Sequence, residues 1–202
     1  MNDTLLLIFT RNPELGKCKT RLAKTIGNEN ALTVYKMLLE HTVNITKSLD
    51  CDKAVYYSVK VRDNDYWDAA IYQKHQQHGG DLGIRMRNAF SDSFKNGYKK
   101  VLIVGSDLYD LTPQHIEDAI NQLDNHDVVI GPALDGGYYL LGMKELNQSV
   151  FENKEWGTET VRKDTLENLK HKKVSLLETL NDIDIFDDIK DYEIFKPYLT
   201  KV

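Results

Sequence analysis

Short apolar runs alternate along the chain with longer stretches in which apolar residues recur at helical spacing. The apolar runs are rich in aliphatic, β-branched and aromatic residues, a composition that predicts strands. The run KVLIVGSD at 100–107 is the clearest of them and has the continuous apolar character of a central parallel strand. The predicted strands are residues 4–10, 53–61, 100–107, 127–133, 137–143 and 174–178.

Helices are predicted in the stretches between these runs. In the longest of them, Val34 and Leu38 lie near one face of a helix. Thr112 followed by Pro113 supplies an N-cap and a first-turn proline for another. The predicted helices are residues 29–49, 82–96, 113–124, 158–171 and 186–195.

This order of elements predicts an α/β fold with three layers, in which a mainly parallel sheet is covered by helices on both faces. The length of 202 residues suits one domain, so residues 1–202 are expected to form a single unit. Ligands of such sheets bind beyond the carboxyl ends of the strands. The loops at 11–21 and 105–110 both leave such ends, and we expect them to share one crevice.

The loop RNPELGKCKTRL at 11–22 resembles a phosphate-binding loop but fits neither common pattern. A Walker A loop fails because Arg11 occupies the first glycine position and Cys18 follows Gly16-Lys17. A dinucleotide fingerprint fails because Gly16 is the only glycine in the loop.

What remains in this loop is a glycine turn with basic side chains between a strand and a helix, which favours a small anionic ligand such as a pyrophosphate. The alternative is that the charged residues are merely solvated. The candidate phosphate-binding residues are Arg11, Gly16, Lys19 and Arg21.

Carboxylates follow several of the predicted strands. Asp107 is the last residue of the run at 100–107, just past its buried strand, where a carboxylate can hold Mg²⁺ or Mn²⁺. A second metal carboxylate is expected from Asp182 or Asp184, although an acidic lead-in to a helix is an equal alternative. Asp135 precedes two glycines in a segment that reads as a turn, a pocket wall or both. Asp81 reads as a ribose or base contact, or as a helix cap.

Composition limits the classes of partner and the cellular compartment that we expect for the protein. A net charge of −5 implies no general affinity for nucleic acid or anionic membranes, so the basic loop points to a small ligand. The first apolar run is too short for a membrane span and lacks the features of a signal peptide. Cys18 and Cys51 form no C-x-x-C pair, which favours a reducing, cytoplasmic setting.

A set of segments in fixed order carries a family resemblance. These segments are FTRNPELGKCKTRLA, GGDLGIRM, GSDLYDLT, GPALDGGYYLLGM, WGTETV and DIDIFDD. Together they resemble small bacterial GT-A-like glycosyltransferases of the nucleotide-diphospho-sugar transferase superfamily, including those of the arsenosugar-biosynthesis type. The first segment is also similar to that of phospholactate and molybdenum-cofactor guanylyltransferases.

The resemblance implies a Rossmann-like GT-A sheet that binds a nucleotide and a divalent metal. Asp107 matches the metal-binding acid of the family. Two positions depart from its pattern: Tyr109 stands where proline is usual, and Gly157 where serine is usual. The residues that match the family's nucleotide and acceptor segments are Arg11, Lys19, Arg21, Asp81, Arg85, Asp135, Gly136, Gly137, Trp156 and Thr158.

The function expected from these residues is metal-dependent glycosyl transfer from a nucleotide-diphospho-sugar to a small-molecule acceptor. Asp107, Arg11 and Lys19 would stabilise negative charge, and Asp135 is a candidate base. One alternative is a nucleotidylyltransferase that releases pyrophosphate from a nucleoside triphosphate. A second is a nucleotide-binding module without turnover.

Overall fold

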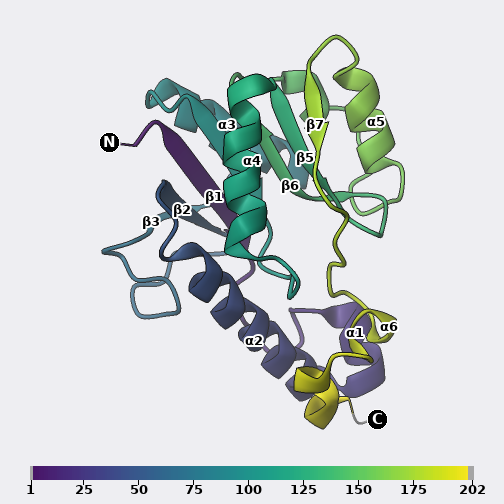
Figure 1. Cartoon of the computed structure of the whole chain (residues 1–202). Helices are drawn as coiled ribbons and strands as arrows, with labels where there is room; N and C mark the ends of the chain where they lie inside the picture. Colours follow the sequence, from purple (N-terminus) through teal and green to yellow (C-terminus); the bar gives the residue numbers. More distant parts are fainter. Residues whose placement is uncertain (1, 200–202) are drawn as a thin grey trace.

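The computed structural model describes residues 2–199, in which a seven-stranded mixed sheet lies between helices (Figure 1). The strand order across the sheet is β3-β2-β1-β4-β6-β5-β7. The strands are β1 (Thr4–Thr10), β2 (Asp52–Tyr57), β3 (Gln73–Gln76), β4 (Lys100–Val104), β5 (Val128–Pro132), β6 (Tyr138–Met143) and β7 (Val174–Leu176).

The sheet is mainly parallel, as predicted, and β6 is the strand that runs the other way. It pairs antiparallel with β4 on one side and with β5 on the other. Because β5 runs in the same direction as β1 and β4, the β5–β6 turn lies at the same edge of the sheet as the loops that follow β1 and β4. The segment around Asp135 therefore joins the crevice predicted for the loops at 11–21 and 105–110.

Helices cover both faces of the sheet, which confirms the three-layer prediction. Alternate residues of β1 separate the two cores: Leu6 and Ile8 pack with α2 and α4, and Leu5 and Leu7 pack with α3. The helices are α1 (Thr20–Ile26), α2 (Asn28–Thr46), α3 (Leu82–Lys95), α4 (Pro113–Asn125), α5 (Val161–Asn168) and α6 (Phe186–Ile189), with 3₁₀ turns η1 (Gln148–Phe151) and η2 (Glu193–Tyr198).

The structure corrects two predicted elements and adds two that were missed. The strand predicted at 53–61 ends at Tyr57, and a further strand, β3, was missed because its residues are polar and mostly exposed. The short α1 was also missed. The helix predicted at 186–195 is wrong: α6 spans only Phe186–Ile189, and after a short break the chain forms the separate 3₁₀ turn η2 at Glu193–Tyr198.

The C-terminal segment folds back onto α1 and α2, next to the loop that follows β1 (Figure 1). Ile183, Ile189 and Phe195 are fully buried there against a cluster that includes Leu22 and Leu38. This packing fixes the chain on both sides of residues 182–184.

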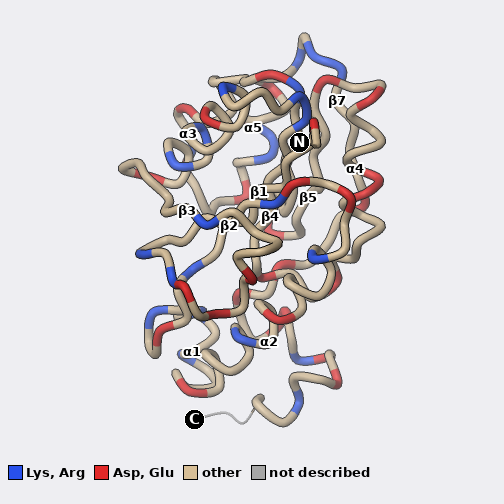
Figure 2. The backbone as a smooth tube through the Cα atoms, turned by 90° about the vertical axis from the view of Figure 1, so that its left-hand side faces the viewer, with Lys and Arg blue, Asp and Glu red and all other residues tan. Residues whose placement is uncertain are grey.

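Basic and acidic residues are interspersed along the backbone in the view of Figure 2. Within residues 2–199, none of the helices has the length and apolar character that crossing a bilayer requires.

Candidate functional site

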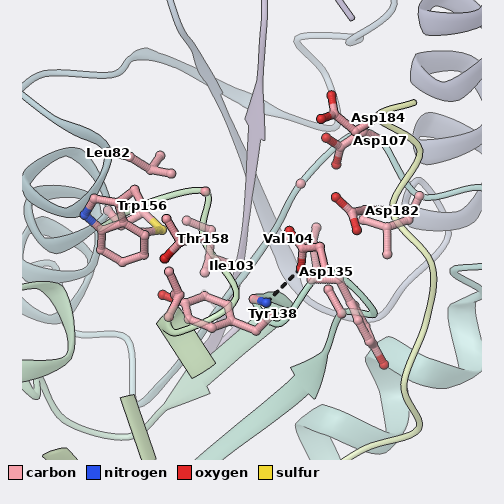
Figure 3. A pocket seen from close by; sticks show the side chains of 18 of the residues that line it. Leu82, Ile103, Val104, Asp107, Asp135, Tyr138, Trp156, Thr158, Asp182 and Asp184 are labelled. Atoms are coloured by element: carbon pink, nitrogen blue, oxygen red, sulfur yellow. Dashed lines mark hydrogen bonds between the residues drawn. The ribbon is translucent and has the colours of Figure 1, made fainter. Parts of the chain in front are cut away.

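Two adjoining cavities lie at the sheet edge where β1, β4 and β5 end and β6 begins. The first, of about 560 Å³, we call the basic lobe because Arg11, Lys17, Lys19 and Arg85 help to line it. The second, of about 360 Å³, we call the acidic lobe because Asp135 and Asp182 help to line it (Figure 3). The residues that line both lobes are Arg21, Leu82, Gly105, Asp107 and Asp184.

The loop after β1 is shaped by two residues with left-handed backbone. Gly16 has φ +73°, in a turn where the Lys17 N–H donates to the Glu14 carbonyl (3.0 Å). Lys19, with φ +47°, starts α1. Its side chain is only 8% exposed, and Nζ lies 3.0 Å from Asp107 Oδ2. The two predicted charge-bearing residues, 88 positions apart in sequence, thus meet where the lobes join.

The hydroxyl group of Tyr35, on α2, holds the start of this loop through hydrogen bonds. Its buried hydroxyl oxygen accepts from the Arg11 N–H (2.9 Å) and lies 3.2 Å from both Thr10 Oγ1 and Ser106 Oγ. Burial raises the pKa of Tyr35 to about 12, so the hydroxyl keeps its proton and can donate to the Arg11 carbonyl. Sequence reasoning did not predict this role.

The basic side chains differ in how firmly they are held. Arg85 Nε donates to the Gly79 carbonyl (3.1 Å), and Lys17 pairs with Glu14 (2.8 Å). Arg21 pairs with Asp184 (2.7 Å). The Arg11 guanidinium forms no hydrogen bond or ion pair with any residue in the described part of the chain, which leaves its donors available to a ligand.

Residues 182–184 are brought to Asp107 by a backbone hydrogen bond. The Ile183 N–H donates to the Asp107 carbonyl (3.1 Å), and the Ile183 side chain is fully buried on the far side. Asp182 and Asp184 line the acidic lobe, and Figure 3 shows both on the same side of it as Asp107.

Asp182 is a carboxyl that sequence reasoning named only as an alternative to Asp184. Burial raises its pKa to about 6, helped by the negative charges of Asp135 and Asp107 and opposed by Lys19. Its proximity to two other carboxylates makes this part of the crevice a strong attractor for cations.

Asp135 occupies a tight turn and also lines the acidic lobe. Its Oδ1 accepts from the Gly137 N–H (2.7 Å), so both interpretations of this segment hold. Gly136 has φ +91°, and a Cβ there would lie 2.5 Å from the backbone of Glu159. The turn is therefore packed directly against the segment that carries Trp156 and Thr158.

The side of the acidic lobe opposite the carboxylates is apolar and aromatic (Figure 3). Trp156 packs over Gly83, where a Cβ would lie 2.7 Å from the indole nitrogen. Trp156 also meets Tyr138 edge to face, with ring centroids 6.5 Å apart. Thr158 turns its hydroxyl to the Glu155 carbonyl (2.8 Å). Tyr139, next to Tyr138, points to the other core and donates to the Glu178 carbonyl (3.1 Å).

Three predicted site residues do not line either lobe. Asp81 caps α3 by accepting from the Ile84 N–H (2.8 Å), while Gly16 and Gly136 form turns behind the lining residues. A ligand contact for these three remains a prediction. The predicted residues that the crevice does bring together are Arg11, Lys19, Arg21, Arg85, Asp107, Asp135, Gly137, Trp156, Thr158 and Asp184.

Residues 2–199 contain no group of three or more His, Cys, Asp or Glu side chains that could hold a metal ion by themselves, so a cation here would need oxygens from a ligand or from water. Mg²⁺ is usually held by one or two carboxylates together with phosphate oxygens and water. Asp107 and its carboxylate neighbours match that pattern.

Known proteins resemble this chain in sequence and in fold. A 2-phospho-L-lactate guanylyltransferase from Methanocaldococcus jannaschii is 28% identical over 131 residues, 64% of this chain and 56% of the relative. A crystal structure from Desulfovibrio desulfuricans G20, of a protein assigned to the nucleotide-diphospho-sugar transferases, is 31% identical. It has a TM-score of 0.87 and covers 98% of this chain and 92% of its own.

A more distant structure, a cytidylyltransferase from Leptospira borgpetersenii, has a TM-score of 0.61 at 12% identity, over 93% of this chain and 84% of its own. It shows the fold alone.

Fold and similarity together place the chain in the class of nucleotide-utilising transferases. Within that class it belongs to the family described as "Uncharacterized protein conserved in bacteria (DUF2064)", whose model matches residues 42–158. The match includes Asp107, Asp135 and Trp156. The chain spans little more than half the length of the guanylyltransferase, so similarity to that enzyme does not by itself define a substrate.

Proposed function

We propose that the chain is a glycosyltransferase that depends on Mg²⁺ or Mn²⁺, with a nucleotide-diphospho-sugar as donor and a small molecule as acceptor. The nucleotide phosphates would lie in the basic lobe, and the reacting bond would lie at the boundary marked by Asp107. The acceptor would enter the acidic lobe.

The separation of charge between the two lobes carries this proposal. Arg11, Lys19 and Arg85 line the basic lobe, where they match the oxygens of a diphosphate. Asp135 and Asp182 line the acidic lobe, which suits hydroxyl groups better than a second phosphate. A molecule with a diphosphate at one end and a sugar at the other fits this polarity.

The residues near the boundary fit a divalent cation. Asp107 and Asp182 would hold it, and we prefer Asp182 to the predicted Asp184 because Asp184 already pairs with Arg21. When bound, the ion would supply charge neutralisation for a departing diphosphate.

The chain's own residues would complete the chemistry. Lys19 and Arg11 would stabilise negative charge on the leaving nucleoside diphosphate, which is the largest contribution in many such sites. Asp135, oriented by the Gly137 N–H, would accept the proton of the acceptor hydroxyl as it attacks the sugar carbon.

A second function is nucleotidyl transfer, in which pyrophosphate leaves a nucleoside triphosphate. The guanylyltransferase relative favours it, and so do the cations of the basic lobe, which are placed to hold a pyrophosphate.

Product analysis distinguishes the two reactions. The protein would be incubated with Mg²⁺ or Mn²⁺ and with panels of nucleoside triphosphates and nucleotide sugars, followed by assay of pyrophosphate and nucleoside diphosphate. Glycosyl transfer releases nucleoside diphosphate from a nucleotide sugar and needs Asp107, so Asp107→Asn should be inactive. Pyrophosphate from a triphosphate would instead establish nucleotidyl transfer, and binding without any product would support a module without turnover.

A matched pair of lysine variants tests the placement of the phosphates. Lys19→Gln should weaken nucleoside diphosphate binding roughly ten- to a hundredfold, because a buried charge-assisted contact is lost. Lys17→Gln should change it little, since Lys17 is 72% exposed and pairs with Glu14. Titration calorimetry measures both, and equal losses would reject the assignment of Lys19.

A further inference from the structure

A buried network of three hydroxyl groups joins two loops of the crevice. Tyr35 is 3% exposed, and its Oη lies 3.2 Å from Thr10 Oγ1 at the end of β1 and 3.2 Å from Ser106 Oγ after β4. Ser106 Oγ in turn donates to Thr10 Oγ1 (3.1 Å). The next residues along the chain, Arg11 and Asp107, carry charged side chains that line the basic lobe. One hydroxyl of α2 therefore connects the residues that precede the proposed phosphate and cation ligands.

The carboxylate of Asp107 depends on this network through Ser106. β4 ends at Val104, and a Cβ at Gly105 would lie 2.7 Å from Asp107 Oδ1, so the carboxylate folds back over residue 105. Two bonds then hold the chain on either side of it: the Ser106 hydroxyl is bonded in the network, and the Ile183 N–H donates to the Asp107 carbonyl (3.1 Å). Loss of the first bond would free one side of this turn.

The guanidinium of Arg11 depends on the network through its backbone. The Tyr35 hydroxyl accepts from the Arg11 N–H (2.9 Å) and donates to the Arg11 carbonyl (3.1 Å), so both polar backbone groups of this residue meet one oxygen. The guanidinium itself has no hydrogen bond or ion pair in the described part of the chain. Fixing its backbone limits the conformational entropy that is lost when it binds a ligand.

We infer that Tyr35 is a positioning residue, which holds Arg11 and Asp107 at the spacing at which one diphosphate meets both the guanidinium and a cation. Tyr35 acts through the backbone of Arg11 and the side chain of Ser106. The inference rests on the proposed function only for the position of the phosphates and the cation, and it is the same for glycosyl and nucleotidyl transfer. Phenylalanine in place of Tyr35 would keep the ring in the core but remove the shared hydroxyl.

Inorganic pyrophosphate is the probe for the test, because its binding does not depend on the base, the sugar or the bond that breaks. Titration calorimetry without divalent cations measures the effect that passes through Arg11. Tyr35→Phe should weaken pyrophosphate binding roughly three- to tenfold. In the Arg11→Gln background the same change should cost less than about twofold, because the side chain that Tyr35 positions is absent. An undiminished loss in that background would mean that Tyr35 contacts the ligand directly, and would overturn the inference.

The enhancement of pyrophosphate binding by Mn²⁺ measures the effect that passes through Asp107. Calorimetry gives the enhancement, and the electron paramagnetic resonance signal of free Mn²⁺ gives the bound cation. Tyr35→Phe and Ser106→Ala should each lower the enhancement roughly threefold or more, since each releases the turn that carries Asp107. In the Asp107→Asn background neither change should lower it further.

Tyr72→Phe is the matched control. Tyr72 is 2% exposed, packs in the same hydrophobic cluster as Tyr35, and has its hydroxyl 2.8 Å from Oγ1 of Thr46, the last residue of α2. It lines neither lobe. Both variants remove a buried, hydrogen-bonded hydroxyl and should lower Tm by similar amounts, but Tyr72→Phe should leave pyrophosphate binding and its enhancement by Mn²⁺ unchanged.

The outcomes separate this inference from the proposed function. Equal binding effects of the two tyrosine variants overturn the inference, because the loss would then follow from general destabilisation. A parent protein that binds pyrophosphate with Mn²⁺ but transfers no sugar counts against the proposed function alone. A parent protein that binds no pyrophosphate, with or without Mn²⁺, rejects the position of the phosphates on which both depend.

Discussion

At the scale of single residues, Lys19 and Asp107 define the centre of the crevice. A non-glycine residue with positive φ costs about 1–2 kcal/mol, and Lys19 adopts this conformation where its ammonium group reaches Asp107. The ion pair neutralises the negative charge of Asp107, which would otherwise add to the negative charge of Asp182 in the same part of the crevice. A ligand phosphate would compete for the same ammonium group and release Asp107 to a cation.

Asp182 gives the chain a specific dependence of stability on pH. Its folded-state pKa of about 6 lies above the ordinary value of 3.8, so the folded protein holds a proton that the unfolded chain has lost. Its stabilising contribution is therefore fully present below pH 3.8, falls as pH rises from 3.8 to 6, and stays low above that. Asp182→Asn, which cannot ionise, should raise Tm at pH 8 by roughly 2–4 °C, a figure that allows for solvent screening.

Thermal unfolding at pH 4 and at pH 8 measures this effect. The difference between variant and parent should shrink at pH 4, where Asp182 is protonated in the folded state. Asp191→Asn, an exposed acid of the same segment, should show no such pattern. A Tm difference that is the same at both pH values would contradict the assignment.

At the scale of elements, the reversed strand β6 determines the composition of the site. Because β6 runs antiparallel, its first residues and the turn before it face the same crevice as the ends of β1 and β4. The turn can be this tight only with glycine at 136, since φ is +91° and Glu159 leaves no room for a Cβ.

Gly136→Ala should therefore be far more damaging than an ordinary glycine substitution. Strain and the contact with Glu159 should together lower Tm by roughly 5–10 °C. They should also weaken binding of the nucleotide-diphospho-sugar, because the segment of Trp156 and Thr158 must shift. Gly97→Ala is the matched control, with a similar φ of +94° but open space around the Cβ position. It should lower Tm by roughly 2–4 °C and leave binding unchanged. If the two variants changed Tm and ligand binding equally, the contact between residue 136 and Glu159 would be unimportant.

The sequence predicts the elements whose own residues show a pattern of buried apolar positions. It misses the elements whose formation depends on pairing or packing with other elements. The strands at 4–10 and 100–107 are apolar throughout, and α2 has a clear buried face. In contrast, β3 is polar because it lies at an edge, and its existence depends on backbone pairing with β2. The length of α6 likewise depends on packing against α1.

The same limit applies to the site. Asp107 follows a strand, so topology alone predicted that it faces the crevice, whereas Asp135 was named from its glycine-rich segment and the family resemblance. Asp182 was predicted only as an alternative to Asp184 for a second metal carboxylate, because its position beside Asp107 depends on the hydrogen bond between the Ile183 N–H and the Asp107 carbonyl. Tyr138 and Tyr139 pack in different cores, yet both contribute to the lining of the acidic lobe, which the alternation of side chains along a strand does not predict.

At the scale of the whole molecule, the C-terminal segment holds one wall of the crevice in place. Phe195 is fully buried, packs edge to face on Tyr109, and anchors the chain that follows Asp182 and Asp184. Tyr109, where the resembling family usually has proline, thus takes part in this packing. The crevice depends on contacts between segments far apart in sequence.

Phe195→Ala should therefore affect both stability and binding. The cavity should cost about 3–5 kcal/mol, or roughly 6–15 °C in Tm for a chain of this size, and nucleotide affinity should fall because residues 182–184 lose their support. Ile194→Ala, at a neighbouring position that is 43% exposed, should have little effect. Chemical denaturation and calorimetry measure the two quantities, and unchanged binding in Phe195→Ala would show that the wall is held elsewhere.

Both edges of the sheet are short and poorly suited to accepting another strand. β3 has four residues, all polar, and β7 has three that follow two lysines. An exposed strand edge recruits other chains when it is long, flat and apolar, whereas β3 is short and polar and β7 is only three residues long. The sheet that builds the crevice therefore gives little template for aggregation between copies of the protein at high concentration.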